Sequence, residues 1–363
     1  MRSGSGGSSR RCCAGRWIAA GMAVIALATC SAGPDSASGG SEGRPPTTSP
    51  SSDDAAAQEA SSGPGVIIDT DFSLWWDDAT AIGMANILER RGEIRLLGLV
   101  TDVPNASAVA AIDAINTTYG NADIPLGAMA GSANDTFPHG YTDELISRLP
   151  HSVEHSDDVP EAIALYRRLL AAEADHSVTI VAIGSYTNLA RLLDSQPDNA
   201  SDLDGRELIA TKVERLVIMD GLFPAGGAAL TNQEIDPEAA HAVVTGDWPT
   251  PIAWVDGFAG IQTIVGETLC ADAPSEHPMR IVYEELFSCA PPGDGNWDAP
   301  TLLYAIDDLE STFEELGRGG AAVINTSGGL SWQPSSSRSN DVYVHVADQQ
   351  ALNQRIEELL VAD

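Results

Sequence analysis

Four aspartates lie within ten positions of one another, directly after an apolar run, in the stretch GVIIDTDFSLWWDDAT (residues 65–80). They are Asp69, Asp71, Asp77 and Asp78. Carboxylates repel one another and are costly to bury, so gathering them at the end of a buried strand requires a chemical reason. A hard cation would supply one, because calcium takes several oxygen ligands and offsets the repulsion among the acids. Histidine or cysteine clusters, which favour zinc, are missing from the sequence. The stretch therefore predicts a calcium site.

Two other interpretations of the aspartate cluster are open. The letters IIDTDFS resemble the hydrophobic-Asp-x-Asp-x-Ser pattern of the haloacid dehalogenase phosphatases, in which the first aspartate is a nucleophile and magnesium is bound. Those enzymes also use a downstream lysine, but Lys212, the sole lysine, opens a strand well before the end where chemistry is expected. Alternatively, acids favoured by a helix dipole would explain Asp77 and Asp78, but not Asp69 and Asp71 as well.

The elements that must position these acids alternate along the chain. Apolar runs predict strands at residues 65–71, 94–102, 178–184, 213–221, 250–257 and 341–348. Apolar residues at helical spacing predict helices at residues 77–92, 107–120, 161–175, 185–196, 236–246, 298–308 and 349–362. This alternation indicates an α/β fold with an open, mainly parallel sheet and helices on both faces, in Rossmann-like layers. Ligands of such folds bind beyond the carboxyl ends of the strands, and the aspartate cluster falls at such an end.

The charge of the chain limits its partners. The 363 residues include 52 acidic side chains against 19 basic ones, which gives a formal charge of -33. Such a balance argues against nucleic acid and against anionic membrane surfaces as partners. A small-molecule ligand is consistent with it, and the sequence leaves a homo-oligomer open.

The first 64 residues differ in composition from the rest. Residues 1–30 have the basic start and short apolar stretch of a signal peptide, and LATC resembles the lipobox of bacterial lipoproteins, in which Cys30 would be lipidated. An uncleaved anchor or an ordinary secretory signal are the alternatives, and each of the three predicts an extracytoplasmic protein. Residues 31–64 are rich in Ser, Gly and Pro and predict a disordered tether, so the folded domain is expected at residues 65–363.

Two cysteines remain within that domain. Cys270 and Cys289 form an even pair in a chain expected to be exported, which favours a disulfide, with two buried free thiols as the alternative.

Several segments together resemble the nucleoside hydrolases of the inosine-uridine preferring type and its variants. The strand ending Asp69-Thr-Asp71, followed by a turn and by Asp77-Asp78, is similar to the family's signature, although the turn FSLWW is longer than usual. The segments VTIVAIGSYTNLARLL and NWDAPTLLYAID resemble two further family motifs. The resemblance implies that calcium is held by Asp71, Asp78, Asp298 and the carbonyl of Ile183. It also implies that Asp77 is the general base, while Asp69 supports the loop from behind.

The sugar-binding residues of the family are matched in part. The resemblance places Asn105, in LLGLVTDVPNASAVAAIDAIN, and Asn232, in TNQEIDPEAAHAVV, on residues that hold sugar hydroxyls. Three positions depart from the pattern. Leu230 and Pro224 stand where the family has the glutamate and the asparagine that hold the ribose 5′-hydroxyl, and Trp297 replaces a histidine. Trp297 removes a proton donor and offers an aromatic face, which either stacks on a base or packs as core.

The resemblance and the acid cluster imply the same chemistry. That chemistry is calcium-dependent hydrolysis of the N-glycosidic bond of a ribonucleoside or related ribosyl compound, releasing free base and ribose. An exported enzyme of this kind would serve nucleoside catabolism outside the cytoplasm. The alternative is a lipid-tethered protein of the same fold that binds calcium and sugar without turnover.

Overall fold

The computed structural model describes residues 63–73, 75–132, 136–246, 248–290, 295–306, 311–335, 337–338 and 340–362. The predicted signal segment 1–30, its Cys30, and all but the last two residues of the predicted tether 31–64 lie outside the described residues. Within the described part of the chain, none of the helices is both long enough and apolar enough to cross a membrane.

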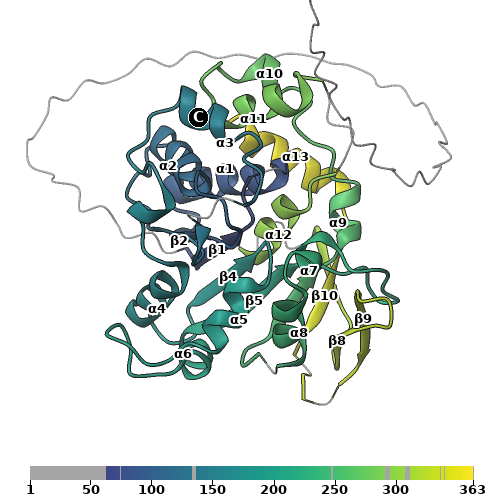
Figure 1. Ribbon diagram of the computed structural model, residues 1–363. Coiled ribbons are helices and arrows are strands. Elements are labelled where there is room, and N and C mark those ends of the chain that lie inside the picture. The colour runs from purple at the N-terminus through teal and green to yellow at the C-terminus, as the bar shows by residue number, and fades with distance from the viewer. Residues whose placement is uncertain are drawn as a thin grey trace, which may run out of the picture. The chain divides into compact units, whose positions relative to one another are not determined.

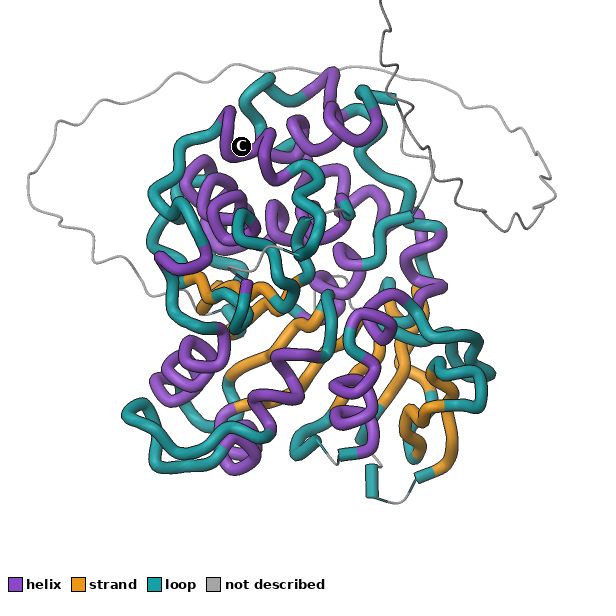
Figure 2. Tube along the Cα trace, in the orientation of Figure 1, coloured by secondary structure: helices purple, strands orange, loops and turns teal. Residues whose placement is uncertain are grey.

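A mostly parallel sheet organises the described residues (Figures 1 and 2). Its strands follow the order β3-β2-β1-β4-β5-β6-β10-β7, and all neighbours pair in parallel except β10 and β7, which are antiparallel. The strands are β1 (Gly65–Thr70), β2 (Arg95–Thr101), β3 (Leu126–Gly127), β4 (Val178–Ala182), β5 (Val213–Met219), β6 (Ile252–Val255), β7 (Phe313–Leu316) and β10 (Val342–Val346). A separate antiparallel hairpin consists of β8 (Gly320–Ile324) and β9 (Leu330–Pro334).

The helices lie between and beyond these strands in the chain. They are α1 (Trp76–Arg90), α2 (Ala108–Thr118), α3 (Thr142–Arg148), α4 (Ala162–Ala172), α5 (Thr187–Leu193), α6 (Gly205–Lys212), α7 (Thr231–Ile235), α8 (Pro237–Thr245), α9 (Gly257–Ile261), α10 (Leu269–Asp272), α11 (Pro278–Phe287), α12 (Asp298–Ala305) and α13 (Gln349–Leu360), with a 3₁₀ turn at Ser156–Asp158. The predicted α/β fold with a mainly parallel sheet is confirmed.

Both faces of the sheet are buried under helices. Side chains along β1 alternate between the two faces: Val66 and Ile68 belong to one apolar core, and Ile67 belongs to the other. The first core includes residues of α1, α2, α11, α12 and α13, and the second includes residues of α4, α5, α6 and α8. In Figure 1 the first set of helices lies above the strands and the second set below. Burial on both faces explains why the central strands are continuous apolar runs.

The helix α1 follows directly from the aspartate stretch. Asp77 and Asp78 occupy its first turn and Arg90 its last, which is the charge arrangement that a helix dipole favours. The chain leaves the helix through Gly92, whose φ of 70° is a left-handed conformation that glycine adopts without a Cβ clash. The sequence thus aims the positive end of α1, with its two acids, at the edge of the sheet where β1 ends.

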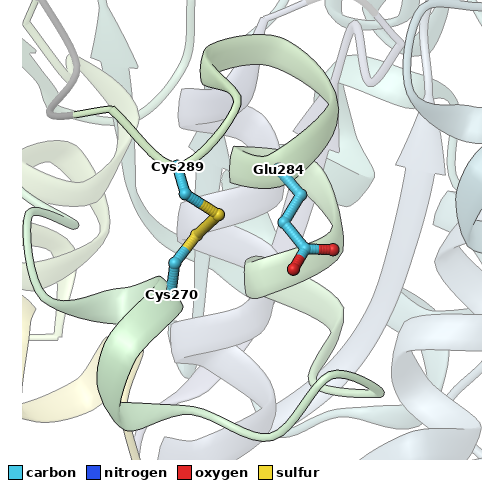
Figure 3. A group of neighbouring side chains, drawn as sticks. All are labelled: Cys270, Glu284 and Cys289. Carbon is cyan, nitrogen blue, oxygen red and sulfur yellow. A yellow bond between two sulfur atoms is a disulfide. The ribbon is translucent and has the colours of Figure 1, made fainter.

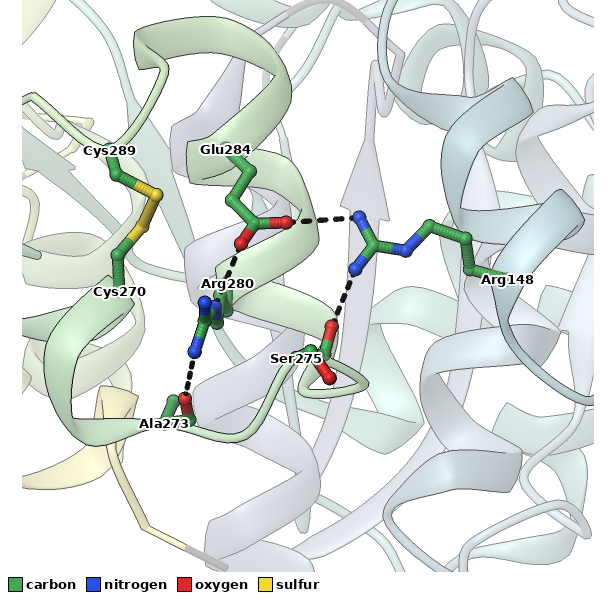
Figure 4. Close-up of a disulfide and its surroundings, with 7 residues drawn as sticks. All are labelled: Arg148, Cys270, Ala273, Ser275, Arg280, Glu284 and Cys289. Atoms are coloured by element: carbon green, nitrogen blue, oxygen red, sulfur yellow. Dashed lines mark hydrogen bonds and ion pairs between the residues drawn. A yellow bond between two sulfur atoms is a disulfide. The ribbon is translucent and has the colours of Figure 1, made fainter.

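A disulfide joins Cys270 in α10 to Cys289, just beyond α11 (Figure 3). The Glu284 carboxylate lies beside it and binds two arginines (Figure 4). Arg280 donates to Glu284 at 2.9 Å, and Arg148 of α3 donates to it at 3.1 Å. Arg148 also donates to the carbonyl of Ser275 at 2.6 Å, so the cross-linked segment is tied to α3.

Reducing this disulfide is expected to lower the free energy of unfolding by roughly 2–4 kcal/mol, because its closed loop restricts the unfolded chain. The sequence separation of 19 residues is that of a loop of modest length. Denaturant unfolding of the oxidised domain, compared with the double variant Cys270→Ser/Cys289→Ser, measures the effect. Two thiols that react with an alkylating reagent in the denatured, non-reduced protein would contradict the bond.

Candidate functional site

A cavity of about 450 Å³ opens where the parallel strands end. Asp71 follows β1, Ile183 follows β4, Met219 ends β5, and Gly257 lies just after β6. In the strand order, the chain continues from β1 to β2 toward one edge of the sheet and from β4 to β5 toward the other edge. Ligand crevices of α/β sheets form at such a switch point. The lining residues are Asp71, Trp75, Trp76, Asp77, Asp78, Ile183, Met219, Leu222, Leu230, Thr231, Asn232, Gly257, Ile261, Trp297 and Asp298.

Four carboxylates meet in this cavity from two helix starts and one strand end. Asp77 and Asp78 lie in the first turn of α1, and Asp298 is the first residue of α12. Oxygens of these three side chains lie within 4.8 Å of one another, although Asp298 is far away in sequence. Asp71 lines the same wall, and the exposed fractions of the four residues range from 1% to 7%. The structure therefore brings together the predicted base and the three predicted carboxylate ligands.

The protein itself does not neutralise the cluster. Burial, and then the charge of Asp77, raise the pKa of Asp71 to about 7. Burial and the charges of neighbouring aspartates raise the pKa of Asp78 and of Asp298 well above the usual range. The hydroxyl of Thr70 donates to Asp78 Oδ1. No positively charged side chain lines the cavity among its described residues, so a bound cation is the partner that would stabilise the charged forms.

The donor atoms fit a hard cation. Asp71 Oδ2 and Asp298 Oδ1 are buried and have no hydrogen-bond partner among the residues that the structure describes. Buried oxygens of this kind are costly unless a ligand or ion completes them. All the side chains of the cluster offer oxygen, which suits calcium or magnesium rather than zinc. The other group with metal-ligand side chains, Cys270 with Cys289 and Glu284, is closed as a disulfide (Figure 3).

Asp69 lies behind this cavity and does not line it. Its carboxylate accepts hydrogen bonds from Tyr166 Oη and Asn188 Nδ2, both at 2.9 Å. Burial raises its pKa to about 7, while these two hydrogen bonds lower it. Asn188 also donates to the carbonyl of Thr101, so the bonds of Asp69 and Asn188 together connect β1, β2, α4 and α5 beneath the site. This placement agrees with a supporting role rather than with the nucleophile of a phosphatase.

Asn232 and Ile183 meet at the cavity wall. Asn232 Nδ2 donates to the carbonyl of Ile183 at 3.1 Å and to that of Met219 at 3.2 Å. Both amide hydrogens are therefore used to fix the side chain, and its Oδ1 is the group that can accept a bond from a ligand. The Ile183 carbonyl has two lone pairs, so its bond from Asn232 leaves one for a cation.

Asn105 is not brought to the cavity. It is fully buried, its Nδ2 donates to the carbonyl of Pro138 at 3.0 Å, and its Oδ1 accepts the amide of Ser107 at 2.9 Å. The second bond is a local side chain–backbone turn of the type that asparagine favours. Both polar groups of Asn105 are thus engaged, one within its own loop and one with the neighbouring segment, and its contact with a sugar hydroxyl stays a prediction.

Trp297 lines the cavity and is held in place from behind. Its indole Nε1 donates to the carbonyl of Gly257 at 2.9 Å, and its backbone amide faces Asp77 Oδ2 at 3.4 Å. A Cβ at Gly260 would lie 2.1 Å from the Trp297 ring, so only glycine allows this close packing. The side chain is half-buried, and its aromatic face belongs to the ligand cavity rather than to the core alone.

The other two departures from the family pattern, Leu230 and Pro224, have different environments. Leu230 lines the cavity beside Leu222, and both lie within 4 Å of the position that a Cβ of Gly257 would take. Pro224 is not part of the lining, and its carbonyl accepts the amide of Trp332 in β9. The wall formed by Leu222 and Leu230 is apolar. Neither Leu230 nor Pro224 therefore offers a polar side chain that could hold the sugar.

Sequence reasoning passed over Asp102, which directly follows β2. It is 1% exposed, and burial together with the charges of Asp69 and Asp71 raises its pKa well above the usual range. A Cβ at Gly184 would lie 2.5 Å from Asp102 Oδ2 and 2.4 Å from the Asp71 amide nitrogen, which explains the glycine there. The signal was available, because the predicted strand 94–102 ends in this carboxylate. The cavity residues Leu222, Trp75 and Trp76 were not singled out either.

Lys212 lies away from the aspartates. It is the last residue of α6, not the first residue of a strand as expected from the sequence, and β5 begins immediately after it. Its Nζ binds Asp175 Oδ1 at 2.8 Å and the carbonyl of Glu173 at 2.9 Å. The cavity lies at the other end of β5, so this lysine is not positioned for the phosphatase chemistry.

Known proteins share the sequence pattern. Residues 66–291 match the family described as inosine-uridine preferring nucleoside hydrolase. The inosine-uridine preferring nucleoside hydrolase of Leishmania major is 28% identical over 203 residues, which cover 53% of this chain and 60% of the relative. The pyrimidine-specific ribonucleoside hydrolase RihA of Escherichia coli (strain SMS-3-5 / SECEC) is 36% identical over 110 residues, 30% of this chain and 32% of the relative. The matched segments thus span only 32% to 60% of these relatives.

Solved structures share the fold. The type III effector protein XopQ, complexed with adenosine diphosphate ribose, superposes with a TM-score of 0.64 at 14% identity, over 82% of this chain and 94% of that chain. The inosine-uridine preferring nucleoside hydrolase from Bacillus anthracis gives 0.60 at 16% identity, over 82% and 99%. These similarities bear on the fold alone. The resemblance drawn from the sequence is confirmed by the family match, which covers more than half of the chain. The chain belongs to the inosine-uridine preferring nucleoside hydrolase family.

Proposed function

We propose that this chain is a calcium-dependent hydrolase of the N-glycosidic bond of a ribonucleoside or related ribosyl compound. The products would be free base and ribose. The observation that supports this most directly is the cavity itself, in which four buried carboxylates meet at the switch point of the sheet. Family membership supports the same reaction.

Asp77 would act as the general base. Its carboxylate lines the cavity and is the one of the four that the proposal does not use as a cation ligand. It would take a proton from the water that attacks the anomeric carbon, as positioned carboxylates do in other hydrolases. The sugar would pass through an oxocarbenium-like state, whose positive charge the neighbouring carboxylates stabilise. Asn232 Oδ1 would accept a hydrogen bond from a sugar hydroxyl.

Asp71, Asp78, Asp298 and the carbonyl of Ile183 would hold the calcium ion. Their oxygens are buried, and two of the carboxylate oxygens have no partner among the described residues. When bound, calcium would lower the pKa of a water molecule and help to orient the ribose diol.

A second candidate is a protein that binds calcium and sugar but turns nothing over. Trp297 favours it, because the indole N–H is already donated to the carbonyl of Gly257 and cannot protonate a departing base. The enzyme and the binding protein differ in one measurable property, which is the release of free sugar.

The test is a screen of the purified domain, with calcium, against common nucleosides. We expect release of ribose from at least one of them and no release of phosphate from a generic ester with magnesium. Binding of calcium and ribose without any sugar release would support the second candidate instead.

We also propose that the chain is exported and held at the membrane by a lipid on Cys30. The support is the lipobox-like LATC before the Ser/Gly/Pro-rich segment. The mass of the N-terminal peptide of the mature protein tests this directly.

A further inference from the structure

Three tryptophans line the one cavity that holds the carboxylates. Trp75 and Trp76 come from the turn after β1 and the start of α1, and Trp297 precedes α12. Trp297 is fixed by its bond to Gly257, and Trp76 packs edge-on against Phe287 with ring centroids 4.9 Å apart. Two of the three aromatic side chains are therefore held by contacts with the fold.

The remaining charge of the cavity is negative. Asp71, Asp77, Asp78 and Asp298 carry up to four negative charges, and one divalent ion balances two of them. Lysine, arginine and histidine do not occur among the described lining residues. Rigid aromatic faces next to uncompensated carboxylates form the kind of site that attracts an organic cation, because the ring faces and the acids both favour positive charge.

A departing base finds no proton donor in this cavity. The described lining includes no histidine, lysine, cysteine or tyrosine, and its aspartates are assigned as base and cation ligands. Thr231 and the tryptophans are far too weak as acids. A neutral base would therefore depend on a proton from solvent or leave as an anion, whereas a base that carries a positive charge leaves as a neutral molecule without any proton.

From these observations we infer that the preferred substrate is a riboside of a cationic nitrogen heteroaromatic ring, such as a pyridinium or an N-alkylated purinium. The inference rests on the proposed function and specifies its substrate class. In the step, the water oxygen bonds to C1′ and Asp77 takes the water proton. The electron pair of the C1′–N bond moves onto the ring nitrogen, which cancels the positive charge of the base.

The experiment compares two ligands of nearly the same shape. They are the riboside of 3-carbamoylpyridinium, which is a permanent cation, and its neutral 1,4-dihydro form. Binding is measured by calorimetry with the calcium-loaded Asp77→Asn variant, in which cleavage is suppressed. We expect the cation to bind at least about tenfold more tightly. Equal affinity for the two ligands would overturn the inference.

Substitution of the aromatic wall provides the second measurement. Adding Trp297→Leu to the Asp77→Asn variant is expected to reduce the cation-to-neutral affinity ratio by about twofold to thirtyfold, since each cation–π contact has that order of effect. Trp297→Phe keeps an aromatic face and should retain most of the ratio. If thermal melting shows that Trp297→Leu does not fold, Trp75→Leu replaces it. A ratio that neither leucine variant changes would contradict the role of the rings.

Failure of the inference and failure of the proposed function give different results. A parent enzyme that cleaves neutral nucleosides but binds the cation no better would refute only the substrate class. A parent that cleaves no riboside at all would refute the proposed function, and the binding ratio would still decide whether the cavity selects cations. A parent that cleaves a neutral nucleoside as efficiently as the pyridinium riboside would show that a neutral base obtains its proton and would also overturn the inference.

Discussion

Asp77→Asn is expected to lower kcat by about 10²–10⁴-fold while leaving calcium bound, because general base catalysis typically contributes that factor. Asparagine keeps nearly the same shape but cannot take a proton. The measurement is kcat on whichever riboside the screen identifies, together with calcium affinity by calorimetry.

The neighbouring residue is the matched control. Asp78 follows Asp77 in the first turn of α1 and is also buried, yet it is assigned to the cation. Asp78→Asn should therefore weaken calcium binding, and its loss of activity should be partly reversed by high calcium. An Asp77→Asn enzyme as active as the parent would show that the base is another group. Two variants with the same profile would show that the roles of the neighbours are not separate.

Removing calcium with a chelator is expected to lower the melting temperature, and by more at pH 8 than at pH 5. Burial raises the pKa of Asp71 in the folded protein from an ordinary 3.8 to about 7. Between these values the folded protein binds more protons than the unfolded chain, so stability is lost as the pH rises through this window. The loss is about 1.4 kcal/mol per pH unit for each such carboxyl. A bound cation stabilises the charged carboxylates and should remove this part of the dependence.

Asp220 serves as the control for this pH dependence. Its pKa is also raised to about 7 by burial, but it bonds to Tyr186 and to the amide of Gly221 and does not line the cavity. Asp220→Asn should flatten the pH dependence equally with and without calcium, whereas Asp71→Asn should flatten it only in the chelated protein. Thermal melts from pH 4.5 to 8 distinguish these cases. A melting temperature that is insensitive to calcium at every pH would rule out the cation site.

The parallel sheet was predictable because its strands are buried on both faces. The strands β1 (GVIIDT) and β4 (VTIVA) are mostly apolar and are buried at every position, and the helices between them show their spacing clearly. The edge was not predictable. The strand β7 (FEEL) has no fully buried side chain, and the hairpin pairs β8 (GAAVI), which is a short run of mostly small residues, with β9 (LSWQP), in which only the first residue is buried. Their strand pairing depends on neighbours that are distant in sequence.

The site was predictable where a residue's position in its element decides its placement. Asp71 and Ile183 follow parallel strands, and Asp77 lies in the first turn of a helix, so their convergence follows from the topology. Asn105 also follows a strand, but its side chain bonds to the amide of Ser107, two residues later, and to Pro138. Whether such a side chain bonds to its own loop or to a ligand depends on the surrounding packing. A pattern of residue types along the sequence does not reveal this packing.

The order in which the chain is made adds a consequence to the spacing of Asp71 and Asp298. The first lies at the end of the first strand, and the second begins the next-to-last helix. Both acids belong to one cluster, so a growing chain cannot assemble the cluster until six of the eight strands of the sheet, β1 to β6, have been synthesised. Closing so long a segment is slow, and contacts that need it form late. A cation bound to the cluster would therefore stabilise the finished fold rather than initiate folding. A chain that ends before α12 would lack Asp298 and with it one of the proposed ligands.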